Sequence, residues 1–237
     1  MKPKQYIQGW VEFYKLKFRV TPDVLIPRPE TELLVDEVIR FLQTTNSEPI
    51  TILDIGTGTG NIAISLAKNL SHLRGITIIA TDISKKALKV AKQNANLHGV
   101  KKQITFIQRD LLSSIHNQSV VRSHTILDNL IIVSNLPYIP SARISYLDSS
   151  VGDFEPKVAL DGGADGFELY RKLFQQIKKF ERAPQGWKPK LIACEIDYTH
   201  GELAAYEALK YFPNFDVEVK TDFAHKQRIL TIKRNLF

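Results

Sequence analysis

The stretch ILDIGTGTGN, residues Ile52 to Asn61, decides the fold of this chain. A β-branched, apolar run ends here in three glycines, Gly56, Gly58 and Gly60, and a helix-forming segment follows them. Glycine permits positive φ angles and a close approach of the main chain, so a ligand can lie against backbone N–H groups at the start of the following helix. The stretch therefore predicts a strand, a tight ligand-binding turn and a helix.

The chain around this turn alternates between strand and helix patterns. Short runs rich in β-branched residues predict five strands: 50–55, 76–81, 104–108, 130–133 and 191–195. Apolar residues at helical spacing predict three helices: 61–70, 84–98 and 166–180. Such alternation is typical of βαβ units, in which helices cover both faces of a parallel sheet. Two further strands, 215–220 and 228–233, flank a short polar loop and predict a closing antiparallel hairpin.

Length and composition indicate one globular domain. The chain has 237 residues and is 43% hydrophobic, and no apolar run approaches the roughly 18 residues that cross a bilayer. Cys194 is the single cysteine, so no internal disulfide can form; we expect a cytoplasmic protein without a signal peptide. The net charge of +7 would favour an anionic partner such as RNA, but lysines spread over solvated faces explain it more simply.

The glycine spacing and an acid on the next strand indicate which ligand the turn holds. Asp82 follows the strand 76–81, where a carboxylate can accept hydrogen bonds from both hydroxyls of a ribose. Dinucleotide sites favour G-x-G-x-x-G, whereas this turn reads G-x-G-x-G and follows Asp54, which suits the ammonium group of a methionine. We therefore expect S-adenosylmethionine as the cofactor. The loop residues expected to hold it are Gly56, Thr57, Gly58, Thr59 and Gly60.

Asp110 and Leu111 end the third strand and extend the expected site. Asp110 can accept from the amine of adenine, and Leu111 can pack on the ring. Taken alone, Asp110 fits the N-cap of a helix equally well. Ligands of open α/β sheets bind at the carboxyl ends of the strands, however, and these acids stand at successive strand ends. We expect them to share one site.

The fourth strand ends in SNLPYIP, residues 134–140, which is poor material for continuing a strand. An amide nitrogen is a weak nucleophile because resonance delocalises its lone pair. The side-chain oxygen of Asn135 and the carbonyl of Leu136 can accept from both hydrogens of a substrate NH₂ and free its nitrogen to react. Pro137 stiffens the loop, and Tyr138 can lie against the flat substrate group. The stretch suits the binding of a planar NH₂ group, although Asn-Leu-Pro-Tyr alone also fits a simple turn.

Four stretches in the same order resemble the HemK/PrmC type of release factor glutamine methyltransferase: LIPRPETELLV at 25–35, DIGTGTGNIAI at 54–64, SNLPYI at 134–139 and FEPKVALDGGADGFELYR at 154–171. The resemblance implies an α/β, Rossmann-like class I methyltransferase with a mostly parallel seven-stranded sheet. It implies an enzyme that uses S-adenosylmethionine to methylate the glutamine of the GGQ motif in peptide chain release factors.

The resemblance also assigns roles to residues outside the glycine turn. It implies that Arg28, Pro29, Glu30 and Thr31 roof the active site and touch the substrate, although Pro29 and Glu30 also suit a plain helix start. Glu155 and Pro156 are expected to clamp the substrate loop from below. Residues 1–24 are expected to form a hairpin or linker arm, and residues 25–237 the methyltransferase domain.

The chain departs from the family pattern at three places. Family members usually begin with a helical domain, whereas this sequence starts at the linker hairpin. Leu136 replaces a proline of the usual Asn-Pro-Pro-Tyr, and Asp197 stands where a glycine is common.

Two alternatives to a release factor enzyme stay open. One is an adenine-amine methyltransferase on RNA or DNA, and the other is a non-catalytic cofactor-binding partner of the translation machinery. We expect the protein to act on a release factor without a membrane, a metal or nucleic acid binding. Activity close to the ribosome is compatible with this substrate. We expect His200 and His225 on the surface, and residues 113–129 to form a loop or lid.

Overall fold

The computed structural model describes residues 1–45, 49–113, 129–182 and 186–235. The loop or lid expected at 113–129 lies outside the described residues, except for its two end positions. Among the described helices, none combines the length and the apolar character needed to span a membrane.

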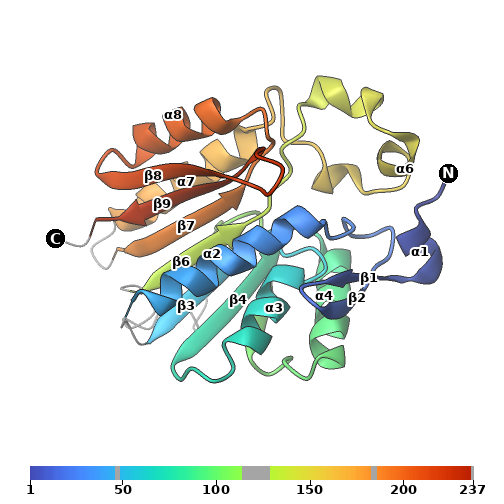
Figure 1. Cartoon of the computed structure of the whole chain (residues 1–237), viewed down its shortest axis with the longest axis horizontal. Coiled ribbons are helices and arrows are strands. Elements are labelled where there is room, and N and C mark those ends of the chain that lie inside the picture. Colours follow the sequence, from blue (N-terminus) through green and yellow to red (C-terminus); the bar gives the residue numbers. More distant parts are fainter. Residues whose placement is uncertain (46–48, 114–128, 183–185, 236–237) are drawn as a thin grey trace.

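Within the described chain, seven strands form the central sheet: β3 Ile50–Ile55, β4 Ile76–Asp82, β5 Ile104–Gln108, β6 Leu130–Ser134, β7 Pro189–Glu195, β8 Phe215–Thr221 and β9 Gln227–Arg234. They lie in the order β5-β4-β3-β6-β7-β9-β8 (Figure 1). The first five in that order are parallel, and β9 is antiparallel to both β7 and β8. This confirms the mostly parallel sheet with an antiparallel C-terminal hairpin.

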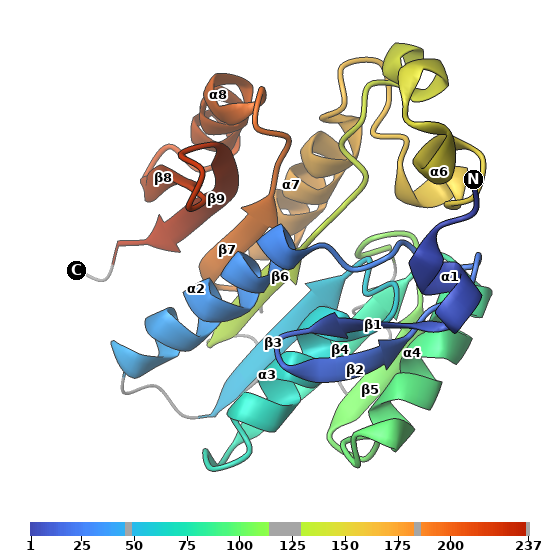
Figure 2. The same ribbon diagram turned by 45° about the vertical axis from the view of Figure 1, so that its right-hand side comes forward.

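Helices cover both faces of the sheet, as the strand-helix alternation predicts (Figures 1 and 2). One face carries α2 Glu32–Gln43, α3 Asn61–Asn69 and α4 Lys85–Leu97, and the other carries α7 Glu168–Glu181 and α8 Gly201–Tyr211. Side chains of β3 alternate between the two cores: Ile52 packs with the first group and Leu53 with the second. Every residue of β3 is buried, as expected for the middle of a parallel sheet.

A small N-terminal arm lies against the first helical layer. It consists of α1 Lys4–Gln8 and an antiparallel hairpin of β1 Trp10–Phe13 and β2 Leu16–Arg19 (Figure 2). The side chain of Asn94 on α4 joins this hairpin to the glycine turn, because it bonds both backbone groups of Arg19 and donates to the carbonyl of Thr59 at 2.9 Å. The arm is thereby fixed to the part of the fold that binds ligand.

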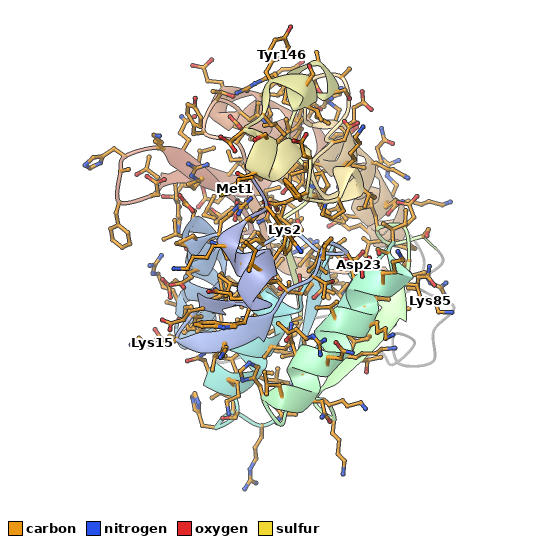
Figure 3. The ribbon with its side chains drawn as sticks, turned by 90° about the vertical axis from the view of Figure 1, so that its right-hand side faces the viewer. Met1, Lys2, Lys15, Asp23, Lys85 and Tyr146 are labelled. Atoms are coloured by element: carbon orange, nitrogen blue, oxygen red, sulfur yellow. The ribbon has the colours of Figure 1, made fainter. Side chains whose placement is uncertain are left out.

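The long connection from β6 to α7 crosses the carboxyl edge of the sheet. It contains three short helical segments: η4 Ser141–Tyr146, α6 Ser149–Gly152 and η5 Lys157–Ala159. Figure 3 shows Tyr146 at the outer end of this connection, far from Lys15 at the tip of the β1–β2 hairpin. A further short helix, η1 Pro29–Thr31, leads into α2.

Candidate functional site

A cavity opens at the carboxyl edge of the sheet, where strand ends β3 to β6 meet the segment that follows β2. Its empty volume is about 1040 Å³ when counted out to the open mouth. Asp23, on the segment after β2, lies close to the start of α4, where Lys85 stands (Figure 3), and Asp23 is one of the lining residues. Most of the expected site residues line this cavity: Arg28, Thr31, Gly56, Thr57, Gly58, Thr59, Asp82, Asp110, Leu111, Asn135, Leu136 and Pro137.

Asp82 stands at the end of β4 with both carboxylate oxygens held by the main chain. Gly58 N–H donates to Oδ2 at 2.9 Å, and Ser84 N–H donates to Oδ1 at 2.8 Å. Burial raises the pKa of Asp82, while the two backbone bonds favour its charged form. Each oxygen keeps a lone pair, so the carboxylate is fixed as a twofold acceptor at the cavity wall. This arrangement fits two ribose hydroxyls.

Asp54 lies beneath the glycine turn and does not line the cavity. It follows Leu53 on β3 and therefore faces α3, where Oδ2 accepts from Thr57 Oγ1 at 2.6 Å and from Ala63 N–H at 3.2 Å. Its other oxygen, Oδ1, is buried without a hydrogen-bond partner in the described chain. Burial raises the pKa of Asp54 to about 7. Its clearest role here is to hold the turn, and the expected contact with an ammonium group stays a prediction.

Gly60 also lies outside the cavity, and its part is to bring two helices together. Its φ is +81°, and a Cβ there would stand 2.9 Å from Ile64 Cδ1 and 3.2 Å from Ala91 Cβ. A side chain at this position would push α3 away from α4. Gly60 therefore shapes the turn from behind, and its expected contact with the cofactor stays a prediction.

The end of β5 supplies the far wall of the cavity. Leu111 has a positive φ of 51°, so the backbone turns at this residue, which lines the cavity. Asp110 forms an ion pair with Lys172 of α7 at 2.5 Å. Arg109 lines the same wall, and its Nε is buried without a hydrogen-bond partner in the described chain. The sequence did not predict Arg109 and Lys172 as site residues, because neither belongs to a motif.

Asn135 is held by its side chain and Leu136 by its backbone. Asn135 Nδ2 donates to Thr31 Oγ1 at 3.1 Å, which leaves Oδ1 on the other side of the amide. Leu136 N–H donates to the hydroxyl of Tyr170 at 3.1 Å, and that hydroxyl donates to the carbonyl of Glu195. Tyr170 is fully buried on α7. The loop that would hold a substrate NH₂ is therefore fixed from η1 and from α7.

Tyr138 does not line the cavity, because its hydroxyl reaches inward. It donates to Glu195 Oε1 at 3.0 Å, and its ring packs against the core beneath α7 and α8. Its expected contact with a flat substrate group stays a prediction. Tyr170 and Glu195 are site residues that the sequence reading missed. Tyr170 lies within the quoted stretch 154–171, so the family-specific motif was the one signal that pointed to it.

Two of the three glycines of the 154–171 stretch, Gly162 and Gly166, brace the same loop from below. Gly162 N–H donates to Ile139 O at 2.9 Å, and a Cβ on Gly162 would lie only 2.7 Å from Pro137 O. A Cβ on Gly166 would collide with the carbonyl of Tyr138. The close approach of these backbones explains why glycine stands at both positions.

The PRPET stretch, 27–31, covers the cavity at three of its positions. Pro27, Arg28 and Thr31 line it, whereas Pro29 and Glu30, in the first part of η1, do not. Arg28 pairs with the buried carboxylate of Glu155, which also accepts from Ile26 N–H at 3.2 Å. Glu155 thus ties the roof of the cavity to the connection that follows β6, much like the clamp expected from the sequence.

The expectation that His200 lies on the surface is wrong. His200 is 7% exposed, precedes α8 and packs against Gly166 and the ring of Phe167. Burial lowers its pKa. The apolar surroundings come from α7 and from the Gly166 turn, which are distant in sequence. His225 is exposed, as expected.

Across the described ranges, no group of three or more His, Cys, Asp or Glu side chains could hold a metal ion. Gly56 adjoins Leu136, since a Cβ there would stand 3.0 Å from Leu136 Cδ2. The glycine turn and the Asn135 loop therefore form one continuous wall, with Asp82 as a fixed acceptor beside it. The residues fit a nucleoside-bearing methyl donor such as S-adenosylmethionine.

Comparisons with known proteins agree with this geometry. A family model described as a methyltransferase domain matches residues 46–147. A release factor glutamine methyltransferase of Moorella thermoacetica is 39% identical over 226 residues, which cover 95% of this chain and 73% of that protein. One of Bacillus cereus is 37% identical over 229 residues, covering 96% and 75%.

Solved structures show the same fold at lower identity. The N-terminal domain of human METTL16 in complex with SAH superposes with a TM-score of 0.60 at 13% identity, covering 94% of this chain and 77% of that one. This likeness covers most of the chain and supports a class I methyltransferase fold.

Proposed function

The chain belongs to the release factor glutamine methyltransferases, and from this membership we propose that it methylates the GGQ glutamine of a peptide chain release factor. The observation that carries the proposal is the fixed Asn135 loop beside the cofactor cavity. There the amide of Asn135 is held by Thr31, and the backbone of Leu136 is held by Tyr170. Such a loop suits a planar NH₂ group.

The cofactor site uses three strand ends. Asp82 would accept from the ribose hydroxyls of the cofactor, the N–H groups of the glycine turn would hold its methionine part, and Asp110 and Leu111 would hold its adenine. When bound, S-adenosylmethionine supplies an electrophilic methyl group on its sulfonium. These roles rest on cavity-lining positions and on the two backbone bonds that fix Asp82.

The substrate amide is held by acceptors on one loop. The Oδ1 atom of Asn135 and the carbonyl of Leu136 take the two hydrogens of the glutamine NH₂, which weakens the delocalisation of its nitrogen lone pair. Arg28 and Thr31 close the cavity over this group. Tyr138 stiffens the loop from below through Glu195.

The residues act chiefly by positioning. Holding two reactants in line can lower a barrier by several kcal/mol, and an amide that gives up a proton after transfer needs no strong base beforehand. This explains how the site works with Leu136 in place of a proline, because Leu136 contributes its backbone carbonyl. Since release factors act on the ribosome, we also infer a cytoplasmic location, possible ribosome proximity and no need for nucleic acid binding.

The test uses purified protein, S-adenosylmethionine and a release factor. Peptide mass analysis should find one added methyl group on the GGQ glutamine. An RNA oligonucleotide run in parallel should gain none; methylated adenine with an unmodified release factor would favour the adenine-amine alternative instead.

Asn135→Ala tests the role of the loop. It should abolish transfer while the dissociation constant for S-adenosylmethionine, measured by calorimetry, stays nearly unchanged. Asn96→Ala, at an exposed position on α4, is the matched control. Full turnover by Asn135→Ala would contradict the assigned role.

A further inference from the structure

A groove lined by lysines runs along α4. Its empty volume is about 1460 Å³ when counted out to open solvent, and its walls come from α4, from the edge strand β5 and from the turn between them (Figure 2). Among the described residues no carboxylate lines it, and every charged residue that does so is a lysine: Lys85, Lys86, Lys89, Lys92 and Lys101. We call this feature the lysine groove. The sequence suggested lysines spread over solvated faces, whereas the fold gathers these five together.

The positive charge of the lysine groove is almost uncompensated. Its five lysines are exposed, and within the described chain only Lys86 forms an ion pair, with Asp23 at 3.3 Å. Because both partners are exposed, water and salt screen this pair strongly. Lys85, Lys89 and Lys92 stand at positions i, i+4 and i+7 of α4, so they share one side of the helix. The groove therefore presents a row of unpaired ammonium groups.

This arrangement works against the stability of α4. Like charges at i and i+4, such as Lys85 and Lys89, repel each other. Cations are also unfavourable in the first turn of a helix, where the backbone carries a partial positive charge, yet Lys85 and Lys86 occupy this turn and no acidic residue does. Solubility alone would be served by lysines at any exposed position. A row that weakens its own helix is better explained by an anionic ligand.

The lysine groove suits a phosphate backbone better than an acidic protein surface. Protein interfaces are depleted of lysine and are anchored by Trp, Tyr or Arg, and none of these three residue types lines the groove. The ammonium group of lysine is a compact charge on a flexible stem, so it can follow the phosphates of a strand without a fixed geometry. Amide groups and one aromatic ring complete the lining: Gln93, Asn96, Gln108 and Phe106. Basic grooves that also offer an aromatic ring are typical of sites for single-stranded nucleic acid.

We propose that the lysine groove binds the phosphate backbone of single-stranded RNA. The choice of RNA over DNA rests on the proposed function, because release factors act on the ribosome. The groove adjoins the cofactor cavity without sharing any of its lining residues. Ser84 and Ala87 of α4 line the cavity, whereas Lys85 and Leu88 line the groove. Bound RNA therefore leaves the cavity free for methyl transfer.

Fluorescence anisotropy with a labelled RNA of about 20 nucleotides and mixed sequence tests the proposal. The double variant Lys89→Gln, Lys92→Gln removes two phosphate contacts. The slope of the logarithm of the binding constant against the logarithm of the salt concentration should therefore become shallower by about 1.4, and the dissociation constant at about 0.1 M salt should rise roughly 10-fold or more. The free energy of unfolding should not fall, because the substitutions relieve repulsion on α4.

The double variant Lys68→Gln, Lys179→Gln is the matched control. It removes the same charge from exposed positions on α3 and α7 that lie outside the lysine groove, and it should bind RNA nearly as the unmodified protein does. Equal weakening in both double variants would show an effect of net charge alone and would overturn the proposal. Displacement of the RNA by polyglutamate at equal charge concentration would overturn it in favour of an acidic protein. Tighter binding of a DNA strand of the same sequence would overturn the choice of RNA.

The binding test does not depend on turnover. Lys89 and Lys92 lie outside the cofactor cavity, so their double variant should methylate a release factor at the rate of the unmodified protein. A protein that binds RNA through the groove but leaves the release factor unmodified would refute the proposed function alone. A protein that methylates the release factor but does not bind RNA would refute the role of the lysine groove alone.

Discussion

The substitution Gly162→Ala should lower the rate of methyl transfer, although the new methyl group would not touch the substrate. Gly162 lies beneath the Asn135 loop, where a Cβ would stand 2.7 Å from Pro137 O and 2.8 Å from Tyr138 Cα. Ordinary contacts begin at 3.4 Å, so the loop backbone would have to retreat by about 0.7 Å, which is 3.4 minus 2.7. Neither neighbour is the flexible end of a side chain, and the backbone itself must move.

The expected loss follows from that displacement. A misplacement of about 1 Å can cost roughly 100-fold in rate, so a shift of this size should lower kcat by about 10- to 100-fold. Overpacking should also reduce the free energy of unfolding by about 1–3 kcal/mol. The cofactor contacts of Asp82 lie on another strand, so the affinity for S-adenosylmethionine should change little.

Steady-state kinetics on a release factor, together with calorimetry for the cofactor, measures both effects. Gly152→Ala is the matched control, because its nearest neighbours would be 3.7 Å away and its φ is not positive. It should behave as the unmodified protein. A Gly162→Ala protein with normal kcat would refute the reasoning that the two glycines set the position of the loop.

Three further predictions concern other parts of the site. Asp82→Ala should raise the dissociation constant for S-adenosylmethionine, measured by calorimetry, by roughly 10- to 100-fold, because hydrogen bonds to a charged group contribute about 1.5–3 kcal/mol. Unchanged affinity would contradict the role of Asp82 in holding the ribose. Tyr170→Phe leaves the N–H of Leu136 and the buried carbonyl of Glu195 without their hydrogen-bond partner. Urea unfolding should therefore show a loss of about 2–3 kcal/mol in the free energy of unfolding, and kcat should fall. The control Tyr211→Phe removes a partly exposed hydroxyl and should cost little. Asp54 has a pKa raised to about 7, so its contribution to stability is full at low pH and is lost as pH rises through 7. Between the ordinary pKa of 3.8 and the raised pKa of about 7, the folded state holds a proton that the unfolded state has lost. The unfolding free energy of the unmodified protein should therefore fall over this pH range relative to that of Asp54→Asn and level off above it. A constant difference would show that the Asp54 carboxyl does not titrate there.

Much of the fold could be predicted because its signals are local. The run Ile50 to Ile55 is apolar at every position, as buried parallel strands are, and the glycines after it mark the turn into α3. The order of strand and helix patterns was enough to infer a parallel sheet. The expected strands and helices are all present, although their ends differ: β7 begins at Pro189 and α7 at Glu168.

The site was harder to predict because side-chain direction depends on distant partners. Asp54 shares the face of Ile52 on β3 and turns toward α3, so its expected contact with the ligand stays a prediction. Side chains alternate between the two faces of a strand, so the direction of Asp54 could have been predicted from that of Ile52. His200 looked like a surface residue because its apolar neighbours, among them Phe167, come from another element.

Tyr170 and Glu195 illustrate the same limit for hydrogen bonds. Tyr170 sits on the buried face of α7 and resembles any core aromatic residue, and only the folded chain brings its hydroxyl to Leu136. Glu195 ends an apolar strand, and its contact with Tyr138 joins residues that lie 57 positions apart. No spacing rule connects such pairs.

The most direct test of the account is the site of methylation on a release factor. After incubation with the purified protein and S-adenosylmethionine, fragmentation of the GGQ peptide should place a single methyl group on the side-chain nitrogen of its glutamine. A release factor in which that glutamine is replaced by alanine should gain none. Methyl groups at other residues, or an unmodified GGQ peptide beside a protein that binds the cofactor tightly, would contradict the account.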